Sequence, residues 1–191
     1  MDKNNLDKLR LELSINAKNG IDFIISASII WLLLAYLWTL SGTSYDKSVF
    51  TFIIGSLMIP LALVMSKLLK TNWKVKNNPL QPLGLWLNFA QLFYFPFLVF
   101  VLIKQPDYFI MTYAIITGAH FFPYAWFYNE KAYAVFAAVI SIGSLLIALN
   151  VSIVNIFYVP LFVSVALFFT AVFLILSIRR EKRNALAKLR Q

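Results

Sequence analysis

Six long apolar stretches, separated by short polar segments, place the strongest constraint on how this chain folds. They are residues 21–40, 49–69, 83–103, 108–128, 132–149 and 157–178. A bilayer core of about 30 Å needs roughly 20 helical residues, and each stretch reaches or nearly reaches that length. Backbone groups inside lipid must be satisfied within their own segment, so these stretches are expected to be helices. We therefore predict an all-α polytopic transmembrane bundle of six helices, forming a single integral membrane domain over residues 1–191.

The composition agrees with a membrane protein. Of the 191 residues, 61% are hydrophobic and 13% are charged, and the mean hydropathy is +0.76. A soluble domain is about half apolar and about a quarter charged, and one of this size has too little interior for so many apolar residues. The 17% aromatic content excludes a disordered chain, because such chains are poor in aromatic residues.

The positions of the basic residues predict which side of the membrane each loop occupies. With the N-terminus inside, the basic residues of segments 3–18, 67–76, 131 and 179–190 are cytoplasmic, and Lys47 and Lys104 are outside. This asymmetry follows the positive-inside rule, and it predicts that both termini are cytoplasmic. The net charge of +9 is divided among four short inner segments. That division argues against nucleic-acid binding and favours the anionic lipids of the inner leaflet as partners.

The segments outside the six stretches carry weaker signals. Residues 1–19 place Leu6, Leu9 and Leu13 on one helical face among charged residues, which predicts an amphipathic cytoplasmic start lying on the inner leaflet. Residues 179–191 are expected to be a basic cytoplasmic tail that extends the last helix. The segment 67–82 is the only linker with room for structure of its own.

Several kinds of chemistry are absent from the sequence. There is no cysteine, and His120 is the single histidine, so we expect no metal site and no cofactor. The chain carries no Walker loop, no zinc-protease motif and no nucleophile-elbow motif. Whether the protein is an enzyme is uncertain, and the sequence favours that it is not.

Polar residues recur at helical spacing in the third and fourth stretches, where burying them in lipid is costly. The fourth stretch places Tyr113, Thr117, His120 and Tyr124 on one face of a helix, and the third does the same with Asn88 and Gln91. A four-residue turn joins the two stretches, so we expect their helices to be antiparallel neighbours. These six residues are our candidate ligand-lining site. The alternative is that they only hydrogen-bond across the helix pair and hold it together.

Prolines punctuate four of the six stretches, at Pro60, Pro96, Pro123 and Pro160. Each proline removes a backbone hydrogen bond and frees a carbonyl group one turn earlier. Kinks at these positions either open a cavity or are ordinary irregularities of helix packing.

Two acidic residues, Asp22 and Glu130, lie at the ends of apolar stretches. We expect them to be solvated at the membrane interface or paired with Lys and Arg. A proton-coupling role is the alternative.

Two segments, residues 78–97 and 118–128, resemble those of a small uncharacterised family of bacterial multi-pass integral membrane proteins. Their sequences are NPLQPLGLWLNFAQLFYFPF and GAHFFPYAWFY. The resemblance implies a multi-pass protein of the bacterial cytoplasmic (inner) membrane. It implies no catalytic residues.

Three classes of function remain open from the sequence. A carrier or channel-like protein for a small solute or a lipid would use the six polar residues as its lining. A noncatalytic membrane assembly or partner protein would use them to hold helices together. A lipid-modifying membrane enzyme would depend on His120 as general base, with no acidic residue at its depth. The sequence does not indicate an oligomeric state.

Overall fold

A computed structural model describes residues 3–188, with side chains described for residues 5–180. This part of the chain is all-helical and forms nine α-helices joined by loops and 3-10 turns. The helices are α1 (Lys3–Ala17), α2 (Ile21–Thr39), α3 (Ser44–Gly55), α4 (Met58–Leu69), α5 (Gln81–Leu92), α6 (Phe95–Lys104), α7 (Phe109–Phe127), α8 (Lys131–Asn150) and α9 (Tyr158–Lys188).

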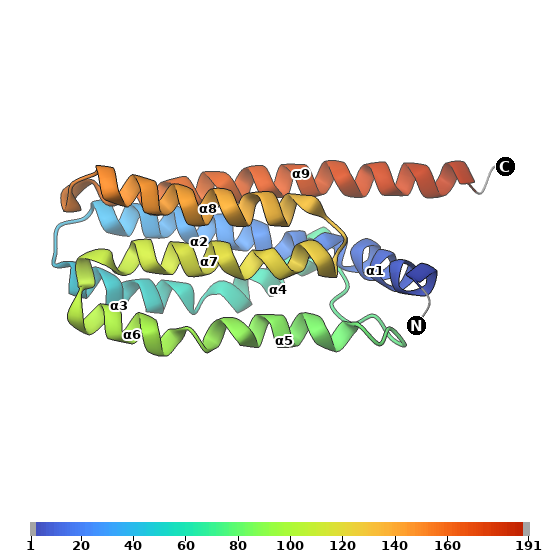
Figure 1. The fold of residues 1–191 in the computed structure, drawn as a ribbon, viewed down its shortest axis with the longest axis horizontal. Coiled ribbons are helices and arrows are strands. Elements are labelled where there is room, and N and C mark those ends of the chain that lie inside the picture. The colour runs from blue at the N-terminus through green and yellow to red at the C-terminus, as the bar shows by residue number, and fades with distance from the viewer. Residues whose placement is uncertain (1–2, 189–191) are drawn as a thin grey trace.

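The long helices run side by side and alternate in direction, so the connections gather at two ends of the bundle (Figure 1). One end, called the α1 end here, holds α1, the α4–α5 loop and the α7–α8 turn, and both ends of the chain lie on that side. The α2–α3, α6–α7 and α8–α9 connections lie at the opposite end. Helix α2 packs along α9 and α4, and α7 packs along α8. Within residues 3–188, the basic segments assigned to one side from the sequence therefore lie at one end of the molecule.

Five helical stretches are long and apolar enough to cross a membrane, within the described residues. They are Asn5–Thr39, Ser44–Leu69, Gln81–Lys104, Lys131–Asn150 and Ile153–Arg180. Helix α7, with 19 residues, is not among these five. The prediction of a helical membrane protein is thus supported by length and composition, and the sixth span depends on α7.

Two prolines explain why the second and third predicted helices are each broken in two. Pro60 has no N–H to donate to the carbonyl of Ser56, and α3 ends at Gly55 just before that residue. Pro96 likewise leaves the carbonyl of Leu92 without its donor, and α5 ends at Leu92. Pro123 lies inside α7, which continues through it. Pro160 lies in the first turn of α9, where no intrahelical donor is needed.

The helix ends differ from the predicted ones where a cap is present. Helix α3 begins at Ser44 instead of residue 49, because the Thr43 hydroxyl accepts a hydrogen bond from the Asp46 N–H at 3.1 Å and caps the helix. Helix α1 packs against the bundle, and Leu13 and Ser14 on it are buried. Helix α9 continues to Lys188, so the tail extends the last helix as expected.

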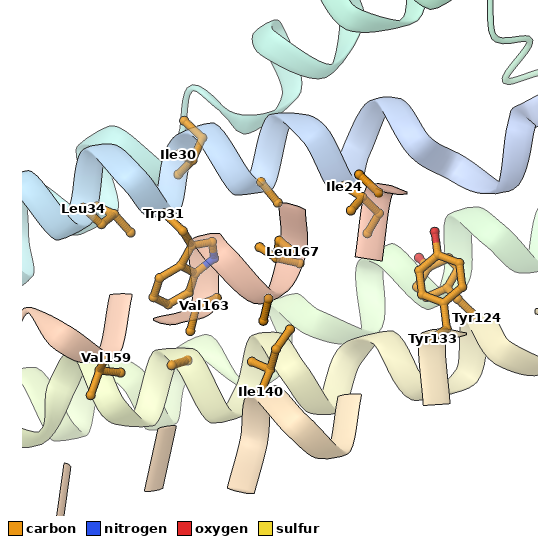
Figure 2. Close-up of a cluster of buried hydrophobic side chains, with 14 of the residues drawn as sticks. Ile24, Ile30, Trp31, Leu34, Tyr124, Tyr133, Ile140, Val159, Val163 and Leu167 are labelled. Atoms are coloured by element: carbon orange, nitrogen blue, oxygen red, sulfur yellow. The ribbon is translucent and has the colours of Figure 1, made fainter. Parts of the chain in front are cut away.

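The helices approach closely through small residues and interdigitated apolar side chains. Ser28 on α2 and Ser164 on α9 each donate a hydrogen bond to the other's backbone carbonyl, at 2.9 and 2.8 Å. Gly118 on α7 leaves no room for a side chain, since a Cβ there would lie 2.9 Å from the backbone nitrogen of Ser141 on α8. Figure 2 shows the core between α2, α8 and α9, which includes Ile24, Ile30, Trp31, Leu34, Ile140, Val159, Val163 and Leu167.

Helices α5 and α6 form the most peripheral part of the bundle. Of the most apolar 18 residues of α5–α6, only 11% are buried, against 44% for the stretch Ile153–Arg180 that contains α9. Helix α5 packs on α7 and α6 packs on α3 and α7, while α4 and α5 barely touch each other. The α5–α6 pair is therefore held mainly by α7.

Candidate functional site

The four polar residues predicted on the fourth helix do lie along α7, and we call them the α7 stripe. Tyr113 packs its ring against Trp31 of α2, with the ring centroids 5.2 Å apart. Thr117 is buried, with 6% of its surface exposed. His120 is half-buried and stacks edge-on against Tyr124 at 5.4 Å. The stripe faces the bundle interior over most of its length.

The predicted residues of the third helix lie on α5, which packs against α7. Gly84 on α5 has no side chain, and the Phe127 ring packs against it. A Cβ at position 84 would lie 3.0 Å from that ring. Asn88 is exposed, and its amide donates to the Gly84 carbonyl of its own helix at 3.0 Å. Gln91 is half-buried. Within the described residues, no hydrogen bond joins Asn88 or Gln91 to α7, so these amides do not bind the two helices together.

Two atoms of the α7 stripe are buried polar atoms without a hydrogen-bond partner. They are the Thr117 Oγ1 and the Tyr124 hydroxyl, and the other such atoms in the described part of the chain are Asn19 Nδ2 and Ser144 Oγ. More than 90% of buried polar groups in proteins have a partner, so each exception needs an explanation. The stripe predicted from helical spacing thus contains half of these exceptions.

Tyr124 belongs to a group of three tyrosines that we call the tyrosine cluster, with Tyr128 and Tyr133. Their ring centroids lie 5.8–6.0 Å apart, and all three are buried. Figure 2 shows the hydroxyls of Tyr124 and Tyr133 pointing the same way, toward the beginning of α2. The cluster closes the α1 end of the stripe.

The tyrosine cluster packs against a left-handed turn between α1 and α2. Lys18, Asn19 and Gly20 have φ angles of 47°, 54° and 68°, which is a costly conformation for the two residues that are not glycine. The turn is fixed by Tyr133, whose hydroxyl donates to the Asn19 carbonyl at 2.5 Å. Ser14 donates to the Asn19 side-chain oxygen at 2.6 Å, and Asn19 is fully buried.

Asp22 is placed differently from the sequence expectation. It is fully buried, and no Lys or Arg pairs with it within the described residues. Its carboxylate instead accepts hydrogen bonds from the Trp73 indole at 2.5 Å and the Thr71 hydroxyl at 2.6 Å. The reason is that the α4–α5 loop, residues 70–80, folds over the start of α2 and covers the carboxylate.

The second acidic residue, Glu130, is half-buried and caps α8 by accepting a hydrogen bond from the Ala132 N–H.

The sequence reasoning missed Asn19, Trp73, Tyr128 and Tyr133 as parts of this site. Two signals pointed to it: a carboxylate at the start of an apolar stretch, and a single linker long enough to fold back. Neither signal identifies the residues of other segments that contact Asp22 and Asn19.

A separate apolar groove of about 590 Å³ lies between α8 and α9 near the opposite end of the bundle. It is lined by Leu146, Ile147, Asn150, Val151, Tyr158, Leu161, Phe162 and Val165. None of the predicted site residues lines it. Among the described residues, no three His, Asp or Glu side chains come together where they could hold a metal ion.

We compared the chain with known protein families, curated proteins and solved structures. No curated protein and no solved structure matches the chain. The sequence model described as "Family of unknown function (DUF7010)" matches residues 6–177. The resemblance to an uncharacterised family is thereby confirmed, and the chain belongs to the DUF7010 family of unknown function.

Proposed function

We propose that this protein is a six-pass membrane carrier or channel-like protein that binds a small solute or a lipid along the α7 stripe. The observation that carries this proposal is the pair of buried, unpartnered hydroxyls of Thr117 and Tyr124. A polar group left unsatisfied in an apolar interior costs free energy, and a polar occupant would offset that cost. Half-buried His120 lies between these two residues on the same face.

The arrangement of α5 supports a lining role more than a purely structural one. Helix pairing by polar residues would require hydrogen bonds between α5 and α7, and the amides of Asn88 and Gln91 make none to α7 among the described residues. The break before Pro96 also separates α5 from α6. We propose that Asn88 and Gln91 face the occupant from this loosely packed side, and that Tyr113 ends the lining.

The proposed orientation has both termini in the cytoplasm of a bacterial cell, with the protein in the inner membrane. The α4–α5 loop and the α7–α8 turn carry Lys70, Lys74, Lys76 and Lys131 at the α1 end, where both ends of the chain also lie. Basic residues concentrate on the cytoplasmic side of membrane proteins. The same lysines would contact anionic lipids of the inner leaflet.

Native mass spectrometry of the protein in a mild detergent tests the proposal. The comparison is between the wild type, the double variant Gln91→Leu plus His120→Leu, and the control variant Thr112→Val plus Ser56→Ala. Each control hydroxyl bonds only to a backbone carbonyl three or four residues earlier in the chain. We expect a stoichiometric small molecule or lipid on the wild type and the control that is lost from the double variant. A wild type without ligand, or a double variant that keeps the ligand, would contradict the proposal.

A second candidate, a noncatalytic assembly protein, is favoured by the exposed aromatic surface of α5–α6. Its members are Trp86, Phe89, Phe93, Tyr94, Phe97 and Phe100, and Phe93 is 84% exposed. A photo-crosslinking residue at position 93 would react with a second protein chain under this alternative. Under the carrier proposal it would react with lipid.

A further inference from the structure

In the α1–α2 turn, the side-chain amide nitrogen of Asn19 is a buried hydrogen-bond donor without a partner. Ser14 donates to the Asn19 side-chain oxygen, which leaves the amide nitrogen as the group directed away from Ser14. The Asn19 carbonyl is occupied by Tyr133. The Asn19 Nδ2 is therefore fully buried, oriented by its neighbours, and without a hydrogen-bond partner.

The tyrosine cluster brings a second unpartnered group to the same turn. A Cβ on Gly20 would lie 3.2 Å from the Tyr128 hydroxyl and 3.4 Å from the Tyr133 hydroxyl, so these groups surround the turn. Tyr124 stacks on both of these tyrosines, and its hydroxyl has no partner. The hydroxyls of Tyr124 and Tyr133 point toward the start of α2 (Figure 2). The turn and the tyrosine cluster, about 105 residues apart in sequence, are thus in contact, and each carries a buried hydrogen-bonding group without a partner.

We infer that this place is the recognition end of the α7 stripe, and that it binds an acceptor oxygen of a small uncharged molecule through Asn19 and Tyr124. This inference rests on the proposed function and adds to it the chemical class of the ligand. A carbonyl or hydroxyl oxygen accepts from both an amide N–H and a phenol O–H. An occupant of that kind satisfies both spare groups at once.

The charge of the surroundings argues against an anion. The fully buried Asp22 carboxylate lies three residues after Asn19, and the half-buried Glu130 lies three residues before Tyr133. A negative ligand would enter next to these acids, where like charges repel strongly in an apolar interior.

A cation is disfavoured for a different reason. The carboxylate oxygens of Asp22 already accept from Trp73, Thr71 and the Phe23 N–H, and Asn19 Nδ2 can only donate. A cationic ligand that carries donors would meet another donor at this place.

Three probes of nearly the same shape separate these charge states: acetamide, acetate and acetamidinium. Each has one methyl group, so saturation-transfer NMR can follow its binding to the purified full-length protein in detergent. We expect saturation of acetamide by the wild type and none above the detergent background for the two ions. Binding of acetate or acetamidinium as strong as that of acetamide, or no saturation of acetamide, would overturn the inference.

Two substitutions test the residues. Tyr124→Phe removes only the hydroxyl, and Asn19→Asp replaces the donor while keeping a residue that tolerates a left-handed turn. Each should weaken acetamide binding about tenfold, as expected for the loss of one buried hydrogen bond. Tyr108→Phe, at an exposed tyrosine beyond the other end of α7, is the matched control and should bind as the wild type does. Unchanged binding by folded Tyr124→Phe would overturn the inference, and circular dichroism establishes that the variant is folded.

The outcomes also separate this inference from the proposed function. If Gln91→Leu plus His120→Leu loses a co-purified ligand while Tyr124→Phe keeps both that ligand and acetamide, the carrier proposal stands and the recognition end is wrong. If Tyr124→Phe loses the ligand while the double variant keeps it, the recognition end stands and the proposed lining by Gln91 and His120 is wrong.

Discussion

The indole nitrogen of Trp73 donates a hydrogen bond of 2.5 Å to the buried carboxylate of Asp22, 51 residues earlier in the chain. The Trp73 ring also stacks on Phe23, with a centroid separation of 4.8 Å. These two contacts attach the α4–α5 loop to the start of α2.

Replacing Trp73 by Phe should therefore destabilise the fold. The ring stacking is largely kept, but a hydrogen bond to a charged group is lost, which is worth about 1.5–3 kcal/mol. We expect a lower midpoint of thermal unfolding in detergent, followed by circular dichroism. Trp86→Phe is the control, because Trp86 is 69% exposed and makes no hydrogen bond within the described residues. Equal stability of the two variants would mean that the Asp22–Trp73 contact does not hold the loop.

The close approach of α7 and α8 predicts that Gly118→Ala is destabilising. The added Cβ would lie 2.9 Å from the backbone nitrogen of Ser141, and a backbone atom cannot move aside without separating the helices. Overpacking of this kind costs about 1–3 kcal/mol. Gly55→Ala is the milder control, since its nearest neighbour would be the Tyr113 hydroxyl at an ordinary 3.4 Å. Denaturant unfolding of both variants in mixed micelles measures the difference, and a Gly118→Ala variant as stable as the wild type would refute it.

The hydrogen bonds exchanged by Ser28 and Ser164 predict a modest cost for removing either hydroxyl. Each substitution by Ala leaves the other bond in place, and interhelical bonds in membrane proteins contribute about 0.6–1.7 kcal/mol. The same unfolding assay should show a loss in that range for each variant. Ser56→Ala should show almost none, because Ser56 is exposed and bonds only to the Ile53 carbonyl of the same chain segment. Losses well above 2 kcal/mol would indicate that the serines do more than join α2 to α9.

Much of the fold could be predicted because its causes are local in sequence. Apolar runs of bilayer length predict the helices, whereas the breaks at Pro60 and Pro96 were not predicted, because Pro123 and Pro160 in equally apolar runs break no helix. Helical spacing also predicts that Thr117 and Tyr124 share a face of α7, where the structure places them. The start of α3 was missed by five residues because the capping group, Thr43, lies outside the apolar run.

The rest of the site depends on which segments meet across the bundle. The bond from Tyr133 to Asn19 joins residues 114 apart, and the bond from Trp73 to Asp22 joins residues 51 apart. Hydropathy and residue spacing do not determine which helices pack against each other. Asp22 was therefore expected to be solvated at the membrane interface or paired with Lys and Arg. It is buried because a loop that the sequence left undefined folds over it.

The Thr117 hydroxyl gives a prediction that separates stability from function. Because this buried hydroxyl has no partner, Thr117→Val removes an unsatisfied polar group from the interior while nearly keeping the side-chain volume. We expect the variant to be more stable than the wild type by about 1 kcal/mol, and to lose the ligand that the wild type retains in native mass spectrometry.

Thr51→Val is the matched control for this prediction, since the Thr51 hydroxyl is buried but fully engaged. It accepts from the Trp38 indole at 3.1 Å and donates to the Lys47 carbonyl at 2.8 Å. Its removal leaves the Trp38 N–H unpaired, so Thr51→Val should lower the unfolding midpoint and leave ligand binding intact. If Thr117→Val is instead destabilised to a similar degree, the Thr117 hydroxyl has a structural partner in the folded protein, and the argument that it awaits a ligand fails.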